Sequence, residues 1–235
     1  MSFGNSVHAA LREWFELPAS LRVGESVPDL VARVWIDAGF RDLEQSREWQ
    51  GRAATMVAAY VGDLDPDFQP MSTERSLAFK ADTFIVEGRI DRIDEWGGGR
   101  QDRVSIVDYK TGRSIPTTDD VRGSQALAMY ALMTQRALGL ECFDVSLHHL
   151  PSGTVVSWEH KESTLERHLD RVAQIAQDVI RAQDTWESSD GGEWLLDELF
   201  PAQPSALCGF CDYWESCAPG QEFTARKQTW EGLDG

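Results

Sequence analysis

The sequence predicts a fold of the α/β class, in the broad sense that includes α+β arrangements, with a small mixed β-sheet flanked by helices. Three observations lead to this prediction. The first ~62 residues place apolar side chains at helical spacing. Residues 72–110 alternate apolar and polar side chains and are rich in Ile, Val and Phe. Helical and strand-like segments then follow one another up to an irregular tail that contains cysteines.

Three amphipathic segments make up the N-terminal helical part. The first, SVHAALREWFEL, begins where Asn5 or Ser6 can serve as the N-cap. The second, VPDLVARVWIDAGF, ends near Gly39. The third, LEQSREWQGRAATMVAAYVGDL, ends before Pro66 and Pro70, because proline cannot continue a helix. We therefore expect helices over residues 6–17, 27–40 and 43–64.

The sheet is expected in the segment that follows. Residues 72–96 predict two antiparallel strands with a break near residues 80–82, GGGRQD (97–102) predicts a turn, and RVSIVDYK (103–110) predicts the next strand. A loop from residue 111 leads into a helix over 119–139 that Gly139 ends. CFDVSLHHL and TVVSWEH predict a hairpin turned at PSG, and residues 164–186 predict a long amphipathic helix.

The composition indicates a folded protein and limits its partners. The chain has 235 residues, of which 42% are hydrophobic, enough for one sizeable domain. It has neither the run of roughly 18 apolar residues that spans a membrane nor the pattern of a signal peptide, so we expect a cytoplasmic protein without a membrane partner. The net charge of −17 argues against tight non-specific binding to a polyanion, although a local basic path remains compatible with it.

Acidic residues lie on two of the expected strands. Asp91 belongs to GRIDRID and Asp108 to RVSIVDYK; if these strands pair, their carboxylates converge and form a hard-oxygen site suited to Mg²⁺ or Mn²⁺. Lys110 lies two residues past Asp108 and therefore faces the same side of the strand, where it is able to orient a water or stabilise a pentavalent phosphate. The alternative is an ordinary solvated surface pair. Asp94 should face away from Asp91, and we expect it to pair with an arginine.

The cysteines predict metal chemistry more than disulfides, because three of them cluster in CGFCDYWESC. Cys208, Cys211 and Cys217 are suited to an iron–sulfur cluster with a non-cysteine fourth ligand. The alternative is zinc, with a histidine such as His148 or His149 as a further ligand. The alternative for these two histidines is an ordinary pair at a strand end. The fourth cysteine of the chain, Cys142, lies in an apolar strand and is expected to be a buried core residue.

Five segments occur in order along the chain: FGNSVHAAL, GRIDRID, IVDYKTG, QALAMYAL and CGFCDYWESC. Together they resemble the motifs of the PD-(D/E)xK nuclease superfamily, in its RecB-type exonuclease family, which is related to the iron–sulfur AddB-like and CRISPR-associated exonucleases. The resemblance extends from residue 4 to about 219. It implies a restriction-endonuclease-like core, a metal-dependent DNA exonuclease and a structural 4Fe–4S cluster. Residues 1–235 would form a single nuclease domain with an N-terminal helical part (1–70), a catalytic sheet with helices (71–185) and a Cys-rich tail (186–235).

The resemblance also implies roles for individual residues. The metal ligands would be His8, Asp91, Asp108 and the backbone carbonyl of Tyr109, and Lys110 would join Asp91 and Asp108 as the catalytic residues. Gln125 and Tyr130 would have supporting roles. For His8, the alternative is a packed or surface histidine on its helix.

Two features depart from the family pattern. The helical motif of the family reads Gln-x-x-x-Tyr, whereas Gln125 and Tyr130 are one residue farther apart and Ala126 occupies the usual glutamine position. Either Gln125 reaches the site from its neighbouring position or that contact is lost. The iron–sulfur members also use a cysteine upstream of the histidine helix, and none precedes His8 here. Two explanations stay open: a natural start further upstream, or loss of that segment.

The functional prediction is therefore a Mg²⁺- or Mn²⁺-dependent exonuclease that acts on DNA ends or single strands in repair or recombination. It would work alone or with a helicase or repair-complex partner, because the chain has no Walker motif of its own. The first alternative is a catalytically weak or inactive module that binds DNA ends or a partner. The others are an interaction protein that works through its cysteine tail, and a nuclease of CRISPR spacer processing.

Overall fold

The computed structural model describes residues 2–96 and 102–233. The chain divides into two compact units. The first unit consists of Met1–Ala38 and Glu44–Ala173, and the second of Gly39–Leu43 and Gln174–Gly235. The first unit holds the N-terminal helices and the sheet, and the second holds the cysteine tail. The interpretation of the whole chain as a single domain stays a prediction.

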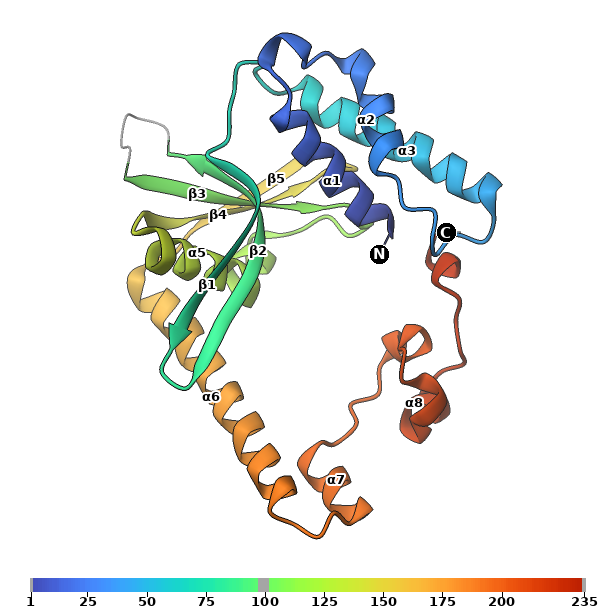
Figure 1. Ribbon diagram of the computed structural model, residues 1–235, viewed down its shortest axis with the longest axis vertical. Coiled ribbons are helices and arrows are strands. Elements are labelled where there is room, and N and C mark those ends of the chain that lie inside the picture. The colour runs from blue at the N-terminus through green and yellow to red at the C-terminus, as the bar shows by residue number, and fades with distance from the viewer. Residues whose placement is uncertain (1, 97–101, 234–235) are drawn as a thin grey trace. The chain divides into compact units, whose positions relative to one another are not determined.

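A mixed sheet of five strands forms the centre of the first unit, as far as the described residues show (Figure 1). The spatial order β1-β2-β3-β4-β5 follows the chain, and every neighbouring pair is antiparallel except the parallel pair β3 and β4. The predicted mixed sheet is thus confirmed. Its strands are β1 (Ser72–Ala81), β2 (Phe84–Glu95), β3 (Arg103–Lys110), β4 (Glu141–His149) and β5 (Thr154–Glu159).

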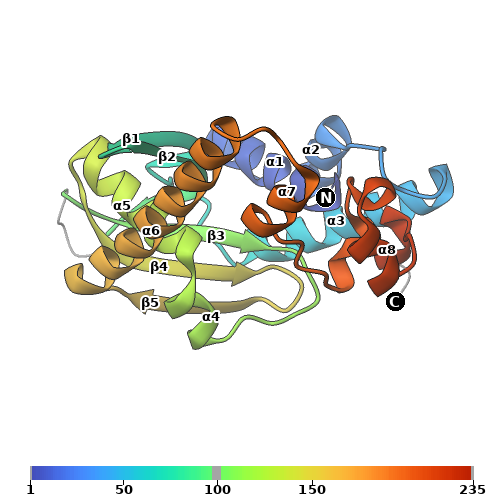
Figure 2. The same ribbon diagram turned by 90° about the horizontal axis from the view of Figure 1, so that it is seen from below.

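Helices cover the sheet because their apolar stripes need a partner. α5 contacts β1 to β4, α4 lies beside β4 and β5, and α1 reaches β1 (Figures 1 and 2). The parallel pair of strands needs a crossover connection, and α4 and α5 supply it. The helices of this part are α1 (Ser2–Glu16), α2 (Val27–Val34), α3 (Leu43–Gly62), α4 (Thr118–Gly123), α5 (Gln125–Leu138) and α6 (Glu162–Glu187).

The main core lies between the sheet and α5. Ile90, Ile93 and Ile106 of β2 and β3 are fully buried with Leu127 and Met133 of α5. Burying a side chain of this kind contributes about 1.5–3 kcal/mol. Cys142 belongs to the same cluster and is fully buried, which confirms the prediction of a core cysteine.

The predictions for the first two helices were wrong at their ends. α1 begins at Ser2, so Asn5 and Ser6 lie inside it rather than at its N-cap. The hydroxyl of Ser6 instead accepts a hydrogen bond from the backbone N–H of Ile36 (3.1 Å). α2 ends at Val34 because Trp35 adopts an extended backbone, and the Trp35 indole donates to Ser46 of α3.

The helix predicted over residues 119–139 is in fact two helices. Ser124, with ψ 110°, breaks the helical path, and its hydroxyl caps α5 by accepting the N–H of Leu127. The end of α5 is as predicted, because Gly139 takes the left-handed conformation that suits glycine (φ 70°). The turn predicted at residues 97–102 lies, except for its last residue, outside the described residues.

The second unit contains the C-terminal part of α6, from Gln174 on, and otherwise short elements. After α6 come α7 (Glu193–Leu199), α8 (Ala218–Phe223) and single turns of 3₁₀-helix over Ala206–Phe210, Trp214–Ser216 and Thr229–Gly232. The sequence prediction missed α7, because its seven residues are too few for periodicity to show. No helix in the described part of the chain is both long and apolar enough to cross a membrane.

A buried histidine follows β5. His160 is 2% exposed, and neither of its ring nitrogens has a hydrogen-bond partner among the described residues. The ring of His168 lies 5.6 Å away, centroid to centroid. Burial, together with the charge of His168, lowers the pKa of His160 to about 4.

The neutral form of His160 should therefore make stability depend on pH. Below its ordinary pKa of about 6.5, His160 takes up a proton in the unfolded chain but not in the folded one. The contribution of neutral His160 to the free energy of unfolding is complete above pH 6.5. It is lost as the pH falls towards 4, by up to about 1.4 kcal/mol per pH unit. Denaturant unfolding of His160→Leu in EDTA should show a weaker loss of stability over this range than the wild type. Parallel curves for the two proteins would contradict the assignment.

Candidate metal centre

The pairing of three strands brings three carboxylates to one level of the sheet. Between β1 and β2, Thr73 lies opposite Arg92 and Arg75 opposite Ile90, so Glu74 falls opposite Asp91. Between β2 and β3, Arg92 lies opposite Val107, so the next position along each strand places Asp91 beside Asp108. Side chains at opposite positions of an antiparallel pair are direct neighbours. The three acidic residues, Glu74, Asp91 and Asp108, therefore come from three adjacent strands.

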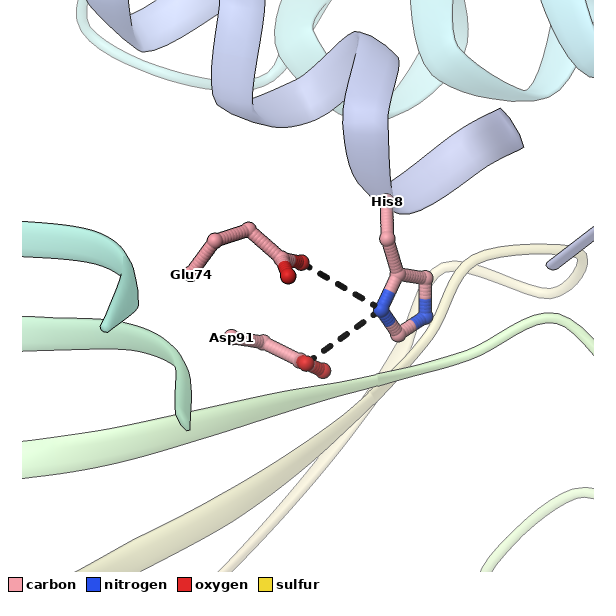
Figure 3. Close-up of side chains that lie close together, drawn as sticks. All are labelled: His8, Glu74 and Asp91. Atoms are coloured by element: carbon pink, nitrogen blue, oxygen red, sulfur yellow. Dashed lines mark ion pairs between the residues drawn. The ribbon is translucent and has the colours of Figure 1, made fainter. Parts of the chain in front are cut away.

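α1 adds a histidine to this group. The Nδ1 atom of His8 lies 3.3 Å from Asp91 Oδ1 and 3.7 Å from Glu74 Oε1, as Figure 3 shows. Ligand atoms of His8, Glu74 and Asp91 all lie within 4.8 Å of one another. No other set of three His, Cys, Asp or Glu side chains in residues 2–96 and 102–233 meets this condition. The residue types, one imidazole and carboxylates, are those that bind divalent cations.

Sequence reasoning missed Glu74. Its backbone has φ 48°, a left-handed conformation that is uncommon for a residue with a side chain and is often found at functional sites. Its Oε1 is buried without a hydrogen-bond partner among the described residues, while Oε2 forms an ion pair with Arg89 (2.8 Å). A buried oxygen without a donor suits a cation. The register of the hairpin at residues 82–83 was the available signal, since it places Glu74 opposite Asp91.

Asp108 and Lys110 lie at the edge of this group. The Lys110 ammonium is 2.5 Å from Asp108 Oδ2 and about half exposed, so the two side chains face the same side, as predicted. Burial and the negative charge of Asp91 raise the pKa of Asp108, against the effect of Lys110. The predicted metal ligands His8, Asp91 and Asp108 lie near one another. The three residues whose ligand atoms all lie within 4.8 Å, however, include Glu74 instead of Asp108.

The electrostatics of the group favour a bound cation. Burial alone would lower the pKa of His8, but the hydrogen bond and charge of Asp91, with the charges of Glu74 and Asp108, raise it overall. Burial and the charge of Asp91 likewise raise the pKa of Glu74. These shifts show that the carboxylates crowd negative charge in a region of low solvation. The residues present therefore fit a hard divalent ion.

Two of the other predicted residues adjoin the centre. The backbone N–H of Tyr109 donates to Asp91 Oδ2 (2.8 Å). A ligand role for the carbonyl of Tyr109 stays a prediction. Tyr130 is half-buried, and burial together with the charges of Asp108 and Asp91 raises its pKa.

Gln125 does not point to this centre. Its side-chain amide donates to the backbone carbonyl of His168 (2.9 Å), and its Oε1 is 3.2 Å from His168 Nδ1. Both ends of the amide are thus held by α6, so the proposed supporting contact of Gln125 with the metal site is absent in this structure. Ser124 caps α5, so Gln125 is the first residue of that helix. The expected pair of Asp94 with an arginine is confirmed, because Arg92 binds it at 2.9 Å.

The two histidines considered as zinc ligands have other partners. His148 Nδ1 bonds to the hydroxyl of Tyr60 (2.7 Å), and His149 bonds through one ring nitrogen to the carbonyl of Gly112 and through the other to Ser152. Both ring nitrogens of His149 are therefore occupied, and the interpretation of these residues as an ordinary strand-end pair is favoured.

The cysteine tail does not assemble a single-ion site. Cys208 and Cys217 both lie around Gly220, where an added Cβ would be 3.6 Å from Cys208 Cβ and 3.3 Å from Cys217 Sγ. In the described part of the chain, the sulfurs of these residues and of Cys211 do not all lie within 4.8 Å of one another. A cluster, whose thiolates stand farther apart, stays a prediction.

A comparison with known protein families places the chain in one of them. The model of the PD-(D/E)XK nuclease superfamily matches residues 1–218, which include the sheet, the metal centre and all three cysteines of the tail. The five-stranded mixed sheet flanked by helices is consistent with the restriction-endonuclease-like fold of that superfamily. No curated protein matches the chain.

The close approach of β2 to α5 beside the centre is testable with two glycines. A Cβ at Gly88 would lie 2.9 Å from Met133 Cε and 3.0 Å from Tyr130 Cε1, so Gly88→Ala should destabilise the fold by about 1–3 kcal/mol. Gly51 in α3 has no atom within 4 Å of its added Cβ, and Gly51→Ala should stabilise by about 0.5–1 kcal/mol. Denaturant midpoints measure both changes. Shifts of the same sign would show that Gly88 is not needed for close packing.

Proposed function

This chain belongs to the PD-(D/E)XK nuclease superfamily, and from that premise we propose that it is a metal-dependent DNA exonuclease that hydrolyses phosphodiester bonds. The observation that carries the proposal is the group of His8, Glu74 and Asp91 beside Asp108 and Lys110. Membership of the superfamily supports nuclease activity, and the arrangement of these side chains supports the binding of a divalent metal ion.

The proposed roles follow from charge and position. His8, Glu74 and Asp91 would hold a Mg²⁺ or Mn²⁺ ion, with Asp108 and the carbonyl of Tyr109 as further ligands. When bound, such an ion lowers the pKa of water and polarises a phosphoryl oxygen. Lys110 is half-exposed and anchored by Asp108, so its ammonium is able to donate to a phosphate oxygen or to orient the attacking water. The carboxylates also repel the anionic backbone, so the substrate approaches productively only when cations compensate this charge.

The finer assignments rest on the resemblance of the five motifs. DNA as substrate, digestion from ends or single strands and a cytoplasmic role in repair or recombination are proposed on that ground. A helicase or repair-complex partner is proposed on the same ground, with a 4Fe–4S cluster on Cys208, Cys211 and Cys217. Because the net charge of the protein is −17, we expect the substrate to bind through local contacts and not through the overall electrostatic field.

Cleavage of end-labelled DNA tests the activity and its site together. We expect single- or double-stranded DNA to be shortened from its ends with Mg²⁺ or Mn²⁺ but not with EDTA. Asp108→Ala and Lys110→Ala should each lower the rate by about 10²–10⁴-fold, because the first loses a proposed metal ligand that also anchors Lys110 and the second loses the group that acts on the reacting phosphate or water. If the folded wild type cleaves nothing, the DNA-end-binding module becomes the better assignment. Cleavage that survives both substitutions would place the active site elsewhere.

The role of Glu74 has a matched control on the neighbouring strand. Glu74→Gln keeps the size of the side chain but removes its charge, and we expect Mn²⁺ to bind at least about tenfold more weakly, as measured by calorimetry. Glu87, on β2, is exposed and belongs to no metal-binding group among the described residues, so Glu87→Gln should bind Mn²⁺ as the wild type does. Equal affinities in the two variants would remove Glu74 from the site.

A further inference from the structure

A buried cation lies directly beside the metal centre in sequence. Arg92 follows Asp91 and is 4% exposed. Its Nε and Nη2 atoms donate to Asp94 Oδ2 at 3.1 and 2.9 Å, and its Nη1 donates to the hydroxyls of Tyr60 (2.9 Å) and Tyr109 (3.2 Å). A charge is buried at a high cost unless it is paired and hydrogen-bonded in this way.

These contacts run in one direction from β2 to β4. A guanidinium only donates hydrogen bonds, so the Tyr60 oxygen accepts from Arg92 and its own O–H is free to be donated to His148 Nδ1 (2.7 Å). Burial and the charge of Arg92 lower the pKa of His148 to about 4, which keeps that nitrogen available as an acceptor. We call Arg92, Asp94, Tyr60, Tyr109 and His148 the Arg92 network.

Tyr109 connects the Arg92 network with the metal centre. Its hydroxyl belongs to the network, whereas its backbone N–H donates to Asp91 Oδ2 (2.8 Å). Its ring meets the ring of His8 edge-on, with centroids 5.7 Å apart and an interplanar angle of 82°. The ring of Tyr60 packs edge-on against the other rings of the network, 5.6 Å from Tyr109 and 5.8 Å from His148. A single residue therefore touches two of the residues that face the ion.

We propose that the Arg92 network positions the metal ligands, with Tyr109 as the positioning residue that fixes the Asp91 carboxylate and the His8 imidazole. Arg92 and Tyr60 hold the Tyr109 ring in one orientation, and the ring and backbone of Tyr109 then limit how far the two ligands turn. Metal sites need this second layer of contacts, because ligand side chains that are free to rotate bind the ion less tightly. The inference rests on the proposed function, since it assumes that an ion binds at His8 and Asp91.

A purely structural role makes a different prediction. Buried ion pairs such as Arg92–Asp94 often contribute little to net stability, so their loss need not alter the metal centre. Tyr109→Phe keeps the ring and the backbone N–H but removes the hydroxyl that Arg92 holds. Tyr60→Phe removes a network hydroxyl on α3, and among the described residues Tyr60 has no hydrogen bond or ring contact with His8 or Asp91. Both variants should bind Mn²⁺ more weakly, Tyr109→Phe by about tenfold and Tyr60→Phe by a smaller factor.

Ser146→Ala is the matched control. It also deletes one buried hydroxyl from the sheet, and that hydroxyl donates to the backbone carbonyl of Ile106 (3.1 Å) outside the Arg92 network. Each variant is titrated with Mn²⁺ by calorimetry, well below its thermal unfolding temperature. Unchanged affinity in Ser146→Ala together with weakened affinity in the two tyrosine variants supports positioning. Equal weakening in all three would mean a general loss of stability and would overturn it.

Asp91→Asn separates the failure of this inference from the failure of the proposed function. If Asp91→Asn loses Mn²⁺ binding while Tyr109→Phe and Tyr60→Phe bind within about twofold of the wild type, the site stands and the positioning role is wrong. If Asp91→Asn binds as the wild type does, the metal site itself is misplaced and the inference falls with it. Should Tyr109→Phe fail to fold, Tyr60→Phe alone decides, because it leaves Tyr109 and both ligands intact.

Discussion

The antiparallel register of β1, β2 and β3 is the constraint on which the candidate site depends. It sets Glu74, Asp91 and Asp108 side by side on three neighbouring strands, where their charges repel one another in partly buried surroundings. A sheet does not assemble such a row for stability, because like charges at opposite positions destabilise the pairing. The row is stable only with compensating cations, and His8, Arg89 and Lys110 lie within reach of it.

Different side chains contact different oxygen atoms of these three carboxylates. α1 contributes His8 from outside the sheet. The apolar side of α1 is buried, and this packing holds the helix and its His8 in place. Arg89 holds one oxygen of Glu74 and leaves the other buried without a donor. The buried pair of Arg92 and Asp94 lies next along β2 and is closed off by the rings of Phe15 and Phe68, 5.5 and 5.4 Å from the guanidinium. The proposed metal ligand Asp91 and the buried pair Arg92–Asp94 thus lie within four residues of one strand.

The strongly acidic composition and a nucleic-acid substrate are compatible on this basis. Net charge describes the distant field, which salt screens within about 10 Å, whereas a cleavage site acts over a few ångströms. An ion held among carboxylates inverts the local sign at the place where a phosphate would lie. Membership of a nuclease superfamily in a chain of charge −17 therefore involves no contradiction.

The sequence by itself determined the elements with a clear period and clear ends. Local alternation and glycine geometry predict three such features: the strand at residues 103–110, the hairpin break near residue 82 and the end of α5 at Gly139. It also supplied the candidate site residues on β2 and β3, because Asp91, Asp108 and Lys110 stand in motifs whose spacing is itself a pattern.

Only the tertiary structure decided the rest, and the reason is that contacts between distant segments leave no local trace. Ser6 and Trp35 look like ordinary helix positions until Ile36 and Ser46 supply their partners. Gln125 lies in a motif that predicts a site residue. Its side-chain amide nevertheless donates to the backbone carbonyl of His168, more than forty positions away. Glu74 is one acidic residue among 39, and although the hairpin register sets it opposite Asp91, only the packing of α1 brings His8 to the pair. Sequence period tells which face a side chain occupies within its own element, whereas the identity of the neighbour across that face is fixed when the elements pack.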